Sequence, residues 1–194
     1  MSKIRLALFA SGSGSNAINI IDHFIGHASV EIAFVLSNKK DAPVIEKSQM
    51  RSVETVILSN DLVSQGSVFI DICREKKVDF IVLAGYLRLI PSDFIHAYHE
   101  RILNIHPSLL PKYGGQGMYG DHVHTAVLNS KEKESGISIH FVDEDFDKGR
   151  MIAQFQCPIS EKDSIDTLKT KIQQLEHSYF PVVIEKTVLN IHHG

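Results

Sequence analysis

The sequence lacks the features of a membrane-spanning or disulfide-stabilised protein. It has no tryptophan and two cysteines, and no apolar run reaches the roughly 20 residues that cross a bilayer. Cys73 and Cys157 match no Cys-x-x-Cys pattern, which favours reduced thiols. The first residues lack a long apolar core before a small-residue cleavage site, so we expect no signal peptide and a cytoplasmic location.

Strong charge is also absent. The formal net charge is −3 and the lysine pairs are scattered, so we expect no nucleic-acid surface. The 11 histidines include His122 and His124, but no Glu-x-x-His or His-x-x-x-His spacing accompanies these two. We therefore expect no metal site.

In the first half of the chain, short apolar or β-branched runs alternate with helical patterns. Strands separated by helix-length segments form right-handed βαβ units, so we expect an α/β fold with one doubly wound, mainly parallel sheet. The expected strands are Ile4–Phe9, Glu31–Leu36, Thr55–Leu58 and Phe80–Ala84, and the expected helices are Asn16–Phe24, Ala42–Arg51, Val68–Lys77 and Pro91–His99.

The second half has a different character. A loop with four glycines precedes two segments of alternating polarity, which indicate an antiparallel strand pair, and a long helix ends the pattern. Without an internal repeat or a linker, we expect one domain over residues 1–194. The segments are the loop Tyr113–Asp121, a helix to Asn129 capped by Asp121, the strands Ile137–Val142 and Met151–Cys157, and the helix Ser164–Leu189 with a bend at Pro181.

The segment that ends in His106-Pro107 is the best candidate for chemistry. Asn104 and His106 alternate with Leu103 and Ile105, so both polar side chains face one side of an extended segment. Pro107 cannot donate to a strand ladder and should end the strand. An amide donor beside a titratable imidazole suits a carbonyl whose oxygen becomes negative while a proton moves.

A glycine-rich turn, Gly12–Ala17, lies between the first expected strand and helix. Amides at a helix N-terminus attract anions, and the turn also fits the dinucleotide pattern Gly-x-Gly-x-x-Ala. A nicotinamide dinucleotide usually has its ribose hydroxyls held by an Asp or Glu at the end of the second strand, and this strand has no such acid. Lys39 and Lys40 follow the strand and could bind an additional phosphate on such a dinucleotide. We favour a single phosphate here over a dinucleotide or a purely structural turn.

The loop between the two late strands carries four acids between Asp143 and Asp147. A solvated turn would explain this composition. Alternatively, one carboxylate folds in beside His106 and favours the imidazolium, since an opposite charge within about 4–6 Å shifts a pKa by about 1–3 pH units.

Together these segments resemble the phosphoribosylglycinamide formyltransferase family, the folate-dependent enzymes of purine synthesis. The resemblance spans nearly the whole chain. It is carried by Gly12-Ser13-Gly14-Ser15-Asn16, Leu83-Ala84-Gly85-Tyr86-Leu87-Arg88, Asn104-Ile105-His106-Pro107-Ser108-Leu109-Leu110-Pro111, His140-Phe141-Val142 followed by Asp147, and Gln173-Gln174-Leu175-Glu176-His177.

The resemblance implies a transferase that moves the formyl group of 10-formyltetrahydrofolate, a co-substrate, to the amine of 5-phosphoribosylglycinamide. It also implies the site. Catalysis would fall to Asn104, His106 and Asp147, the last chosen over Asp143 and Asp145 by its spacing from His140. Substrate binding would fall to Gly14, Ser15, Asn16, Gln173 and Glu176, and folate binding to Leu87, Arg88, Leu89, Ile90, Asn104 and Asp143.

Two segments depart from the family's pattern. The glycine-rich stretch from Gly114 to Asp121 is longer than usual, and Gln65 stands where an arginine near the folate tail is common.

Other family members and other classes of protein offer alternative functions. Methionyl-tRNA formyltransferase needs an added RNA-binding domain and formyltetrahydrofolate hydrolase an added regulatory domain, neither of which we expect here. A non-catalytic nucleotide-binding module leaves Asn104 and His106 unexplained. The oligomer, with a homodimer among the options, is open.

Overall fold

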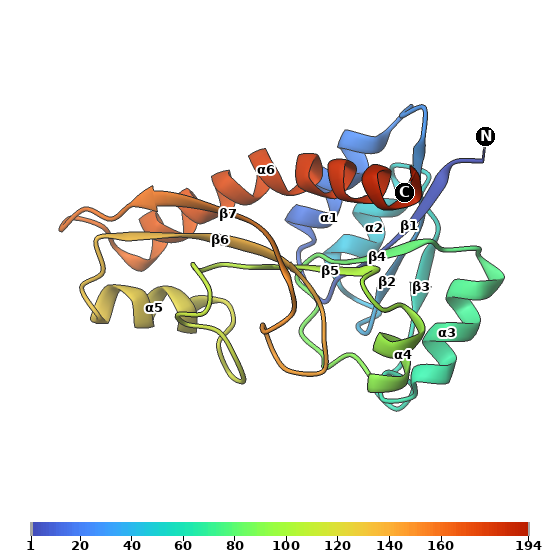
Figure 1. Cartoon of the computed structure of the whole chain (residues 1–194), viewed down its shortest axis with the longest axis horizontal. Helices are drawn as coiled ribbons and strands as arrows, with labels where there is room; N and C mark the ends of the chain where they lie inside the picture. The colour runs from blue at the N-terminus through green and yellow to red at the C-terminus, as the bar shows by residue number, and fades with distance from the viewer. Residues whose placement is uncertain (1, 194) are drawn as a thin grey trace. The chain divides into compact units, whose positions relative to one another are not determined.

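The computed structural model describes residues 2–193. Its strands form a seven-stranded sheet of order β3-β2-β1-β4-β5-β6-β7 (Figure 1). The chain groups into two compact units: one holds the residues up to Leu103 and those from Ile184 on, and the other holds Asn104–Val183. The mainly parallel α/β sheet is confirmed. The single domain stays a prediction.

The first unit alternates strands and helices as the periodicity predicted. β1 pairs in parallel with β2 and with β4, and β2 pairs in parallel with β3. Its elements are β1 (Ile4–Phe9), α1 (Ser15–Phe24), β2 (Val30–Ser37), α2 (Pro43–Gln49), β3 (Thr55–Ile57), α3 (Gly66–Glu75), β4 (Phe80–Leu83) and α4 (Ser92–Ala97), followed by the start of β5 (Ile102–His106).

An aromatic cluster fills the core beside β1. The ring of Phe9 lies 5.5 Å from that of Phe69 in α3 and 6.1 Å from that of Phe94 in α4, measured between centroids. All three side chains have no exposed surface. Since both helices contact the same strand residue, α3 and α4 pack on one face of the sheet, and this burial stabilises the frame from which the loops after β1 and β4 project.

The turn between β1 and α1 requires glycine at Gly14. Its φ is 72°, in the left-handed region, and a Cβ placed there would lie 2.2 Å from a methyl carbon of Val44 in α2. The backbone therefore approaches α2 more closely than any side chain would allow, and this places the N-terminus of α1 at the end of β1.

Replacing Gly14 with alanine should therefore lower the free energy of unfolding by about 3 kcal/mol, from the left-handed backbone and from overpacking against Val44. Gly26 is a matched control, because its φ is 71° but nothing lies within 4 Å of a Cβ there. Gly26→Ala should cost only about 1 kcal/mol. Urea denaturation of the two variants checks this, and equal losses would contradict the close approach.

The second unit contains the predicted antiparallel pair. β6 and β7 are joined in a register that sets Ile137 opposite Phe155, with an irregularity between Ile139 and His140. The unit holds the end of β5, α5 (Asp121–Asn129), β6 (Glu134–Phe141), β7 (Met151–Pro158) and α6 (Ile165–His193) up to Val183. The long final helix, with Pro181 inside it, is confirmed.

Two local expectations were wrong. The expected cap, Asp121, is the first helical residue of α5 and accepts a hydrogen bond from Lys169 at 2.7 Å, while Gly120 stands at the cap. The alternation expected in both late strands holds from Gln154 on in β7, but β6 is buried at every position from Ser135 on. The segment after β5 packs on the polar face of β6, where Ser138 donates a hydrogen bond to the carbonyl of Ser108 at 2.6 Å.

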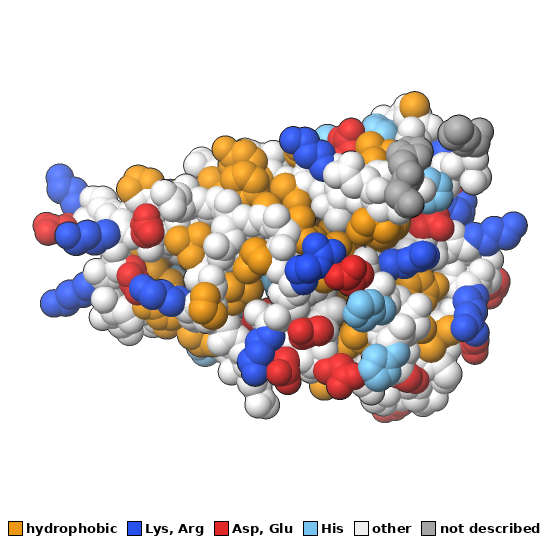
Figure 2. Space-filling view, in the orientation of Figure 1, with side chains coloured by type: hydrophobic (Ala, Val, Ile, Leu, Met, Phe, Trp, Pro, Cys, Tyr) orange, Lys and Arg blue, Asp and Glu red, His pale blue; other side chains and the backbone are white. Residues whose placement is uncertain are grey.

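Apolar side chains gather over β7 and α6 on the face drawn in Figure 2. Met151, Tyr179 and Val182 are each more than a third exposed, and the rings of Phe155 and Tyr179 stack at 3.8 Å. No helix within residues 2–193 has the length and apolar character needed to span a membrane.

Candidate active site

The end of β5 presents Asn104 and His106, as the alternation predicted. His106 is buried, with 4% of its surface exposed, whereas Asn104 is half-buried. Leu103 and Ile105 are buried in the core. The strand ends at His106, where Pro107 follows, so the two polar groups lie at the strand's carboxyl end.

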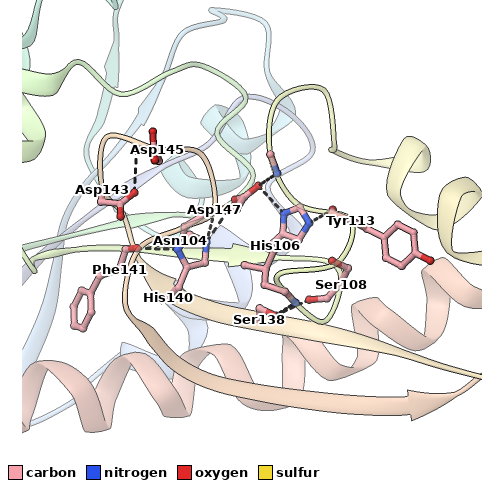
Figure 3. Close-up of polar contacts among 12 residues, drawn as sticks. Asn104, His106, Ser108, Tyr113, Ser138, His140, Phe141, Asp143, Asp145 and Asp147 are labelled. Carbon is pink, nitrogen blue, oxygen red and sulfur yellow. Dashed lines mark hydrogen bonds and ion pairs between the residues drawn. The ribbon is translucent and has the colours of Figure 1, made fainter. Parts of the chain in front are cut away.

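Asp147 connects two histidines in this unit. Its Oδ2 lies 3.5 Å from Nδ1 of His106, and its Oδ1 lies 3.6 Å from Nε2 of His140 (Figure 3). The backbone amide of Gly115 also donates to Oδ2 at 2.9 Å. The structure therefore brings the carboxylate of Asp147 to His106; its catalytic role stays a prediction.

The other acids of the loop point elsewhere. Asp143 is exposed and accepts a hydrogen bond from the amide of Asp145 at 3.1 Å. Asp145 pairs with Lys148 at 3.0 Å, with 67% of its side chain exposed. Asp147 has a φ of 57°, and this left-handed turn directs its side chain inward while the loop on either side stays in solvent.

His140 fixes the amide of Asn104. Its Nδ1 lies 2.8 Å from the carbonyl oxygen of Phe141, which can only accept, so Nδ1 carries a proton. In the neutral ring Nε2 is then an acceptor, and it lies 3.2 Å from Nδ2 of Asn104. This contact orients the carboxamide of Asn104 and leaves its second N–H for a ligand.

The direction of the pKa shift of His106 differs from our expectation. Burial lowers the pKa of His106 below its ordinary value; this effect outweighs the charge of Asp147 and the carbonyl of Tyr113, which raise it, while His140 lowers it further. We expected the neighbouring carboxylate to keep the imidazolium near neutral pH. The sequence pattern located the carboxylate but gave no measure of the solvent removed from the ring.

Asp147 is an anion in this site. Burial alone raises its pKa, but the neighbouring imidazoles of His140 and His106 and the hydrogen bond from the amide of Gly115 hold the pKa below its usual range. The site therefore combines a fixed carboxylate, two imidazoles and one oriented amide. Within residues 2–193 no group of three His, Cys, Asp or Glu side chains is arranged to hold a metal ion.

The glycine-rich turn lies in the first unit, at the carboxyl end of β1. It lines a pocket of about 520 Å³, which has mostly polar walls. Gly14 stands at the N-cap of α1 without a side-chain cap, and a helix N-terminus of this kind attracts an anion. The pocket is lined by Ser11, Gly12, Ser13, Asn38, Lys39, Lys40, Asp41, Ala42, Pro43 and Asn60.

The segment Leu87–Ile90 lies beside that turn. Ser11 accepts a hydrogen bond from the amide of Leu87 at 3.1 Å, and Arg88 donates to Asn60 at 2.6 Å. Leu87 is 59% exposed and Leu89 60%. Two exposed leucines beside a polar pocket are suited to cover a flat ring system.

The two candidate residues of α6 belong to the second unit. Gln173 is exposed and Glu176 is half-buried. They are three residues apart, so they lie on one side of the helix. They sit in the same unit as Asn104 and His106, whereas Gly14, Ser15 and Asn16 belong to the other unit.

Sequence reasoning missed two partners of the catalytic candidates. The contact of His140 with Asn104 was not predicted, because His140 was noted only as part of a motif. The alternating pattern of its strand offered a signal, since it places His140 on the same polar side as Ser138. The carbonyl of Tyr113, 2.7 Å from Nε2 of His106, is a backbone group, and no side-chain pattern could have pointed to it.

Comparison with known proteins identifies relatives over nearly the whole chain. Residues 4–184 match the family model described as formyl transferase. The chain is 37% identical over 187 residues to the chloroplastic phosphoribosylglycinamide formyltransferase of Arabidopsis thaliana, covering 93% of this chain and 64% of that protein. It is 35% identical over 187 residues to phosphoribosylglycinamide formyltransferase of Haemophilus influenzae, covering 93% and 85%.

Among solved structures, phosphoribosylglycinamide formyltransferase from Bacillus halodurans has a TM-score of 0.85 and 37% identity, with 94% of each chain covered. The chain therefore matches nearly all of that bacterial protein, but it spans less than two thirds of the length of the plant relative, of which it covers 64%.

Proposed function

The chain belongs to the formyl transferase family, and we propose that it transfers the formyl group of 10-formyltetrahydrofolate to the amine of 5-phosphoribosylglycinamide in purine biosynthesis. The observation that carries this proposal is the cluster of Asn104, His106 and Asp147, with the carboxylate 3.5 Å from the imidazole. The names of the similar proteins support the same reaction.

The proposed chemistry is acyl transfer through a tetrahedral intermediate. The glycinamide nitrogen bonds to the formyl carbon, whose oxygen becomes an oxyanion, and the bond to N10 of the folate then breaks. The free N–H of Asn104 donates to the oxyanion, and one such donor is typically worth about 2.7–4 kcal/mol. The positive charge that His106 gains when it takes up a proton stabilises the oxyanion electrostatically. The amine proton passes to N10 through His106 or a water.

The carboxylate of Asp147 acts on the charge of His106 during this reaction. A buried imidazole resists protonation, and a carboxylate at 3.5 Å offsets that resistance. The ring can therefore be neutral in the free protein and become cationic as the oxyanion forms. The arrangement stabilises the transition state more than the ground state.

For the substrate, we assign the phosphate to Gly14, Ser15 and Asn16, because they form the N-terminus of α1, where no side chain caps the helix and backbone amides attract an anion. We assign the ribose hydroxyls to Glu176, with Gln173 aiding the phosphate. These roles follow from the resemblance of the motifs.

For the folate, we assign the ring system to Leu87, Arg88, Leu89 and Ile90, with Asn104 at the formyl group. The exposed side chains of Leu87 and Leu89 support this assignment. Asp143 is assigned to the same ligand through its loop. No metal is needed for this chemistry, because the oriented donors already stabilise the oxyanion.

We also propose a reducing compartment such as the cytoplasm, because Cys73 and Cys157 are free. Small molecules are the proposed partners, and the net charge of −3 does not favour nucleic acid. A homodimer would cover the apolar side chains on β7 and α6. Analytical ultracentrifugation distinguishes a dimer from a monomer.

The substrate assignment predicts a preference for the phosphorylated compound. Glycinamide ribonucleotide should be formylated with a kcat/KM at least about a hundredfold above that of the unphosphorylated riboside, because the riboside leaves the anion site empty. A coupled assay that measures tetrahydrofolate and the formylated product checks this. Equal values would contradict the phosphate role of the turn, and release of formate without a formylated product would favour the hydrolase.

A further inference from the structure

The carbonyl of Tyr113 holds the imidazole of His106 on the side opposite Asp147. The carbonyl oxygen lies 2.7 Å from Nε2, and Figure 3 shows the ring between this group and the carboxylate. A carbonyl can only accept, so Nε2 carries a proton. The contact selects the tautomer of His106 in which Nδ1, in the neutral ring, is the nitrogen that can take up a proton.

The backbone that presents this carbonyl is strained. Tyr113 has a φ of 57°, and this left-handed conformation is unfavourable for a residue with a Cβ. Contacts with other residues must therefore stabilise this conformation. One anchor is close in sequence: Ser108 donates to the carbonyl of Lys112 at 2.7 Å.

The second anchor is Glu132, which lies between α5 and β6. The hydroxyl of Tyr113 donates to its Oε1 at 2.9 Å, and Nζ of Lys112 donates to the same oxygen at 2.9 Å. These contacts, the Lys112 contact first, hold the pKa of Glu132 below its usual range. Glu132 is therefore a charged acceptor at neutral pH, and it ties down the side chain of the strained residue.

We propose that Glu132 is a positioning residue: by holding the ring of Tyr113 it keeps the Tyr113 carbonyl against Nε2 of His106, and so sets the orientation and tautomer of the imidazole. Glu132 touches neither His106 nor a reacting group; it acts through Tyr113. The relevance to catalysis rests on the proposed function, whereas the effect on the ring does not.

The inference predicts the direction in which His106 responds. Charged or titratable groups that act on the ring are Asp147 from the loop after β6, His140 from β6 and His124 from α5. None of them changes when the hydroxyl of Tyr113 is removed. Because the Tyr113 carbonyl raises the pKa of His106, its displacement should lower that pKa further.

The test is ¹⁵N NMR of the imidazole nitrogens of His106, followed over pH, in Tyr113→Phe and Glu132→Ala. Both variants should lower the pKa and change the Nε2 and Nδ1 shifts toward a mixture of tautomers. In the formyl-transfer assay kcat should fall about tenfold with little change in KM, since the bound geometry of the reacting groups is less exact.

Two matched variants separate positioning from general destabilisation. Glu132→Gln keeps an acceptor for the tyrosine hydroxyl and should restore shifts close to those of the unchanged protein. Lys112→Met removes the other partner of Glu132. The side chain of Lys112 is 67% exposed, so its loss should leave the imidazole shifts and the pKa of His106 unchanged.

Unaltered imidazole shifts and pKa in both Tyr113→Phe and Glu132→Ala would overturn the inference, and so would an equal effect of Lys112→Met. If Tyr113→Phe does not fold, Glu132→Ala decides. If the unchanged protein transfers no formyl group but the shifts respond as expected, the proposed function fails and the positioning of the ring stands.

Discussion

Replacing His106 with alanine should lower kcat by about a hundredfold or more, and Asn104→Ala should do the same, because the first removes the group that takes up the proton and the second removes a donor to the oxyanion. KM should change little, since these contacts form in the transition state. Steady-state formyl transfer, with circular dichroism to verify folding, measures both effects.

An exposed histidine provides the control. His99 lies on the surface after α4, and His99→Ala should retain the full kcat. The double variant of Asn104 and His106 should lose less than the product of the single losses, because both groups act on the same oxyanion. A kcat near that of the unchanged protein in either single variant would remove that residue from the mechanism.

Exchanging Asp147 for asparagine should lower the pKa of His106 by a further amount of about 1–3 pH units. The carboxylate raises this pKa against burial, which already holds it below the ordinary value. Without the charge the neutral ring persists to lower pH, so the cationic fraction at any given pH decreases. Any limb of the pH–rate profile that is due to His106 should therefore move to lower pH. NMR titration of His106 measures the shift directly.

Asp145→Asn is the matched control for this change. The Asp145 carboxylate pairs with Lys148 in solvent, so the titration of His106 should stay nearly unchanged. A shift in Asp145→Asn and none in Asp147→Asn would mean that the wrong carboxylate was assigned. If neither variant moved the pKa, the electrostatic role of this loop would be wrong.

The sequence by itself determined the frame of the molecule. The strand Ile4–Phe9 was predicted to the residue, because a short run that is apolar except at Arg5, between a polar start and a glycine turn, favours a buried strand. Asn104 and His106 were placed on one side of a strand end, because alternation and Pro107 leave little other choice. These are local rules, and the residues that obey them are adjacent in the chain.

Only the tertiary structure decided what surrounds the catalytic candidates. Sequence spacing favoured Asp147, but its distance from His106 depends on a left-handed turn. The lowered pKa of His106 follows from burial by segments far from it in sequence, and solvent exclusion leaves no local pattern. The Tyr113 carbonyl could not be foreseen for the same reason: a backbone group is common to every residue, and folding alone selects which one meets the imidazole.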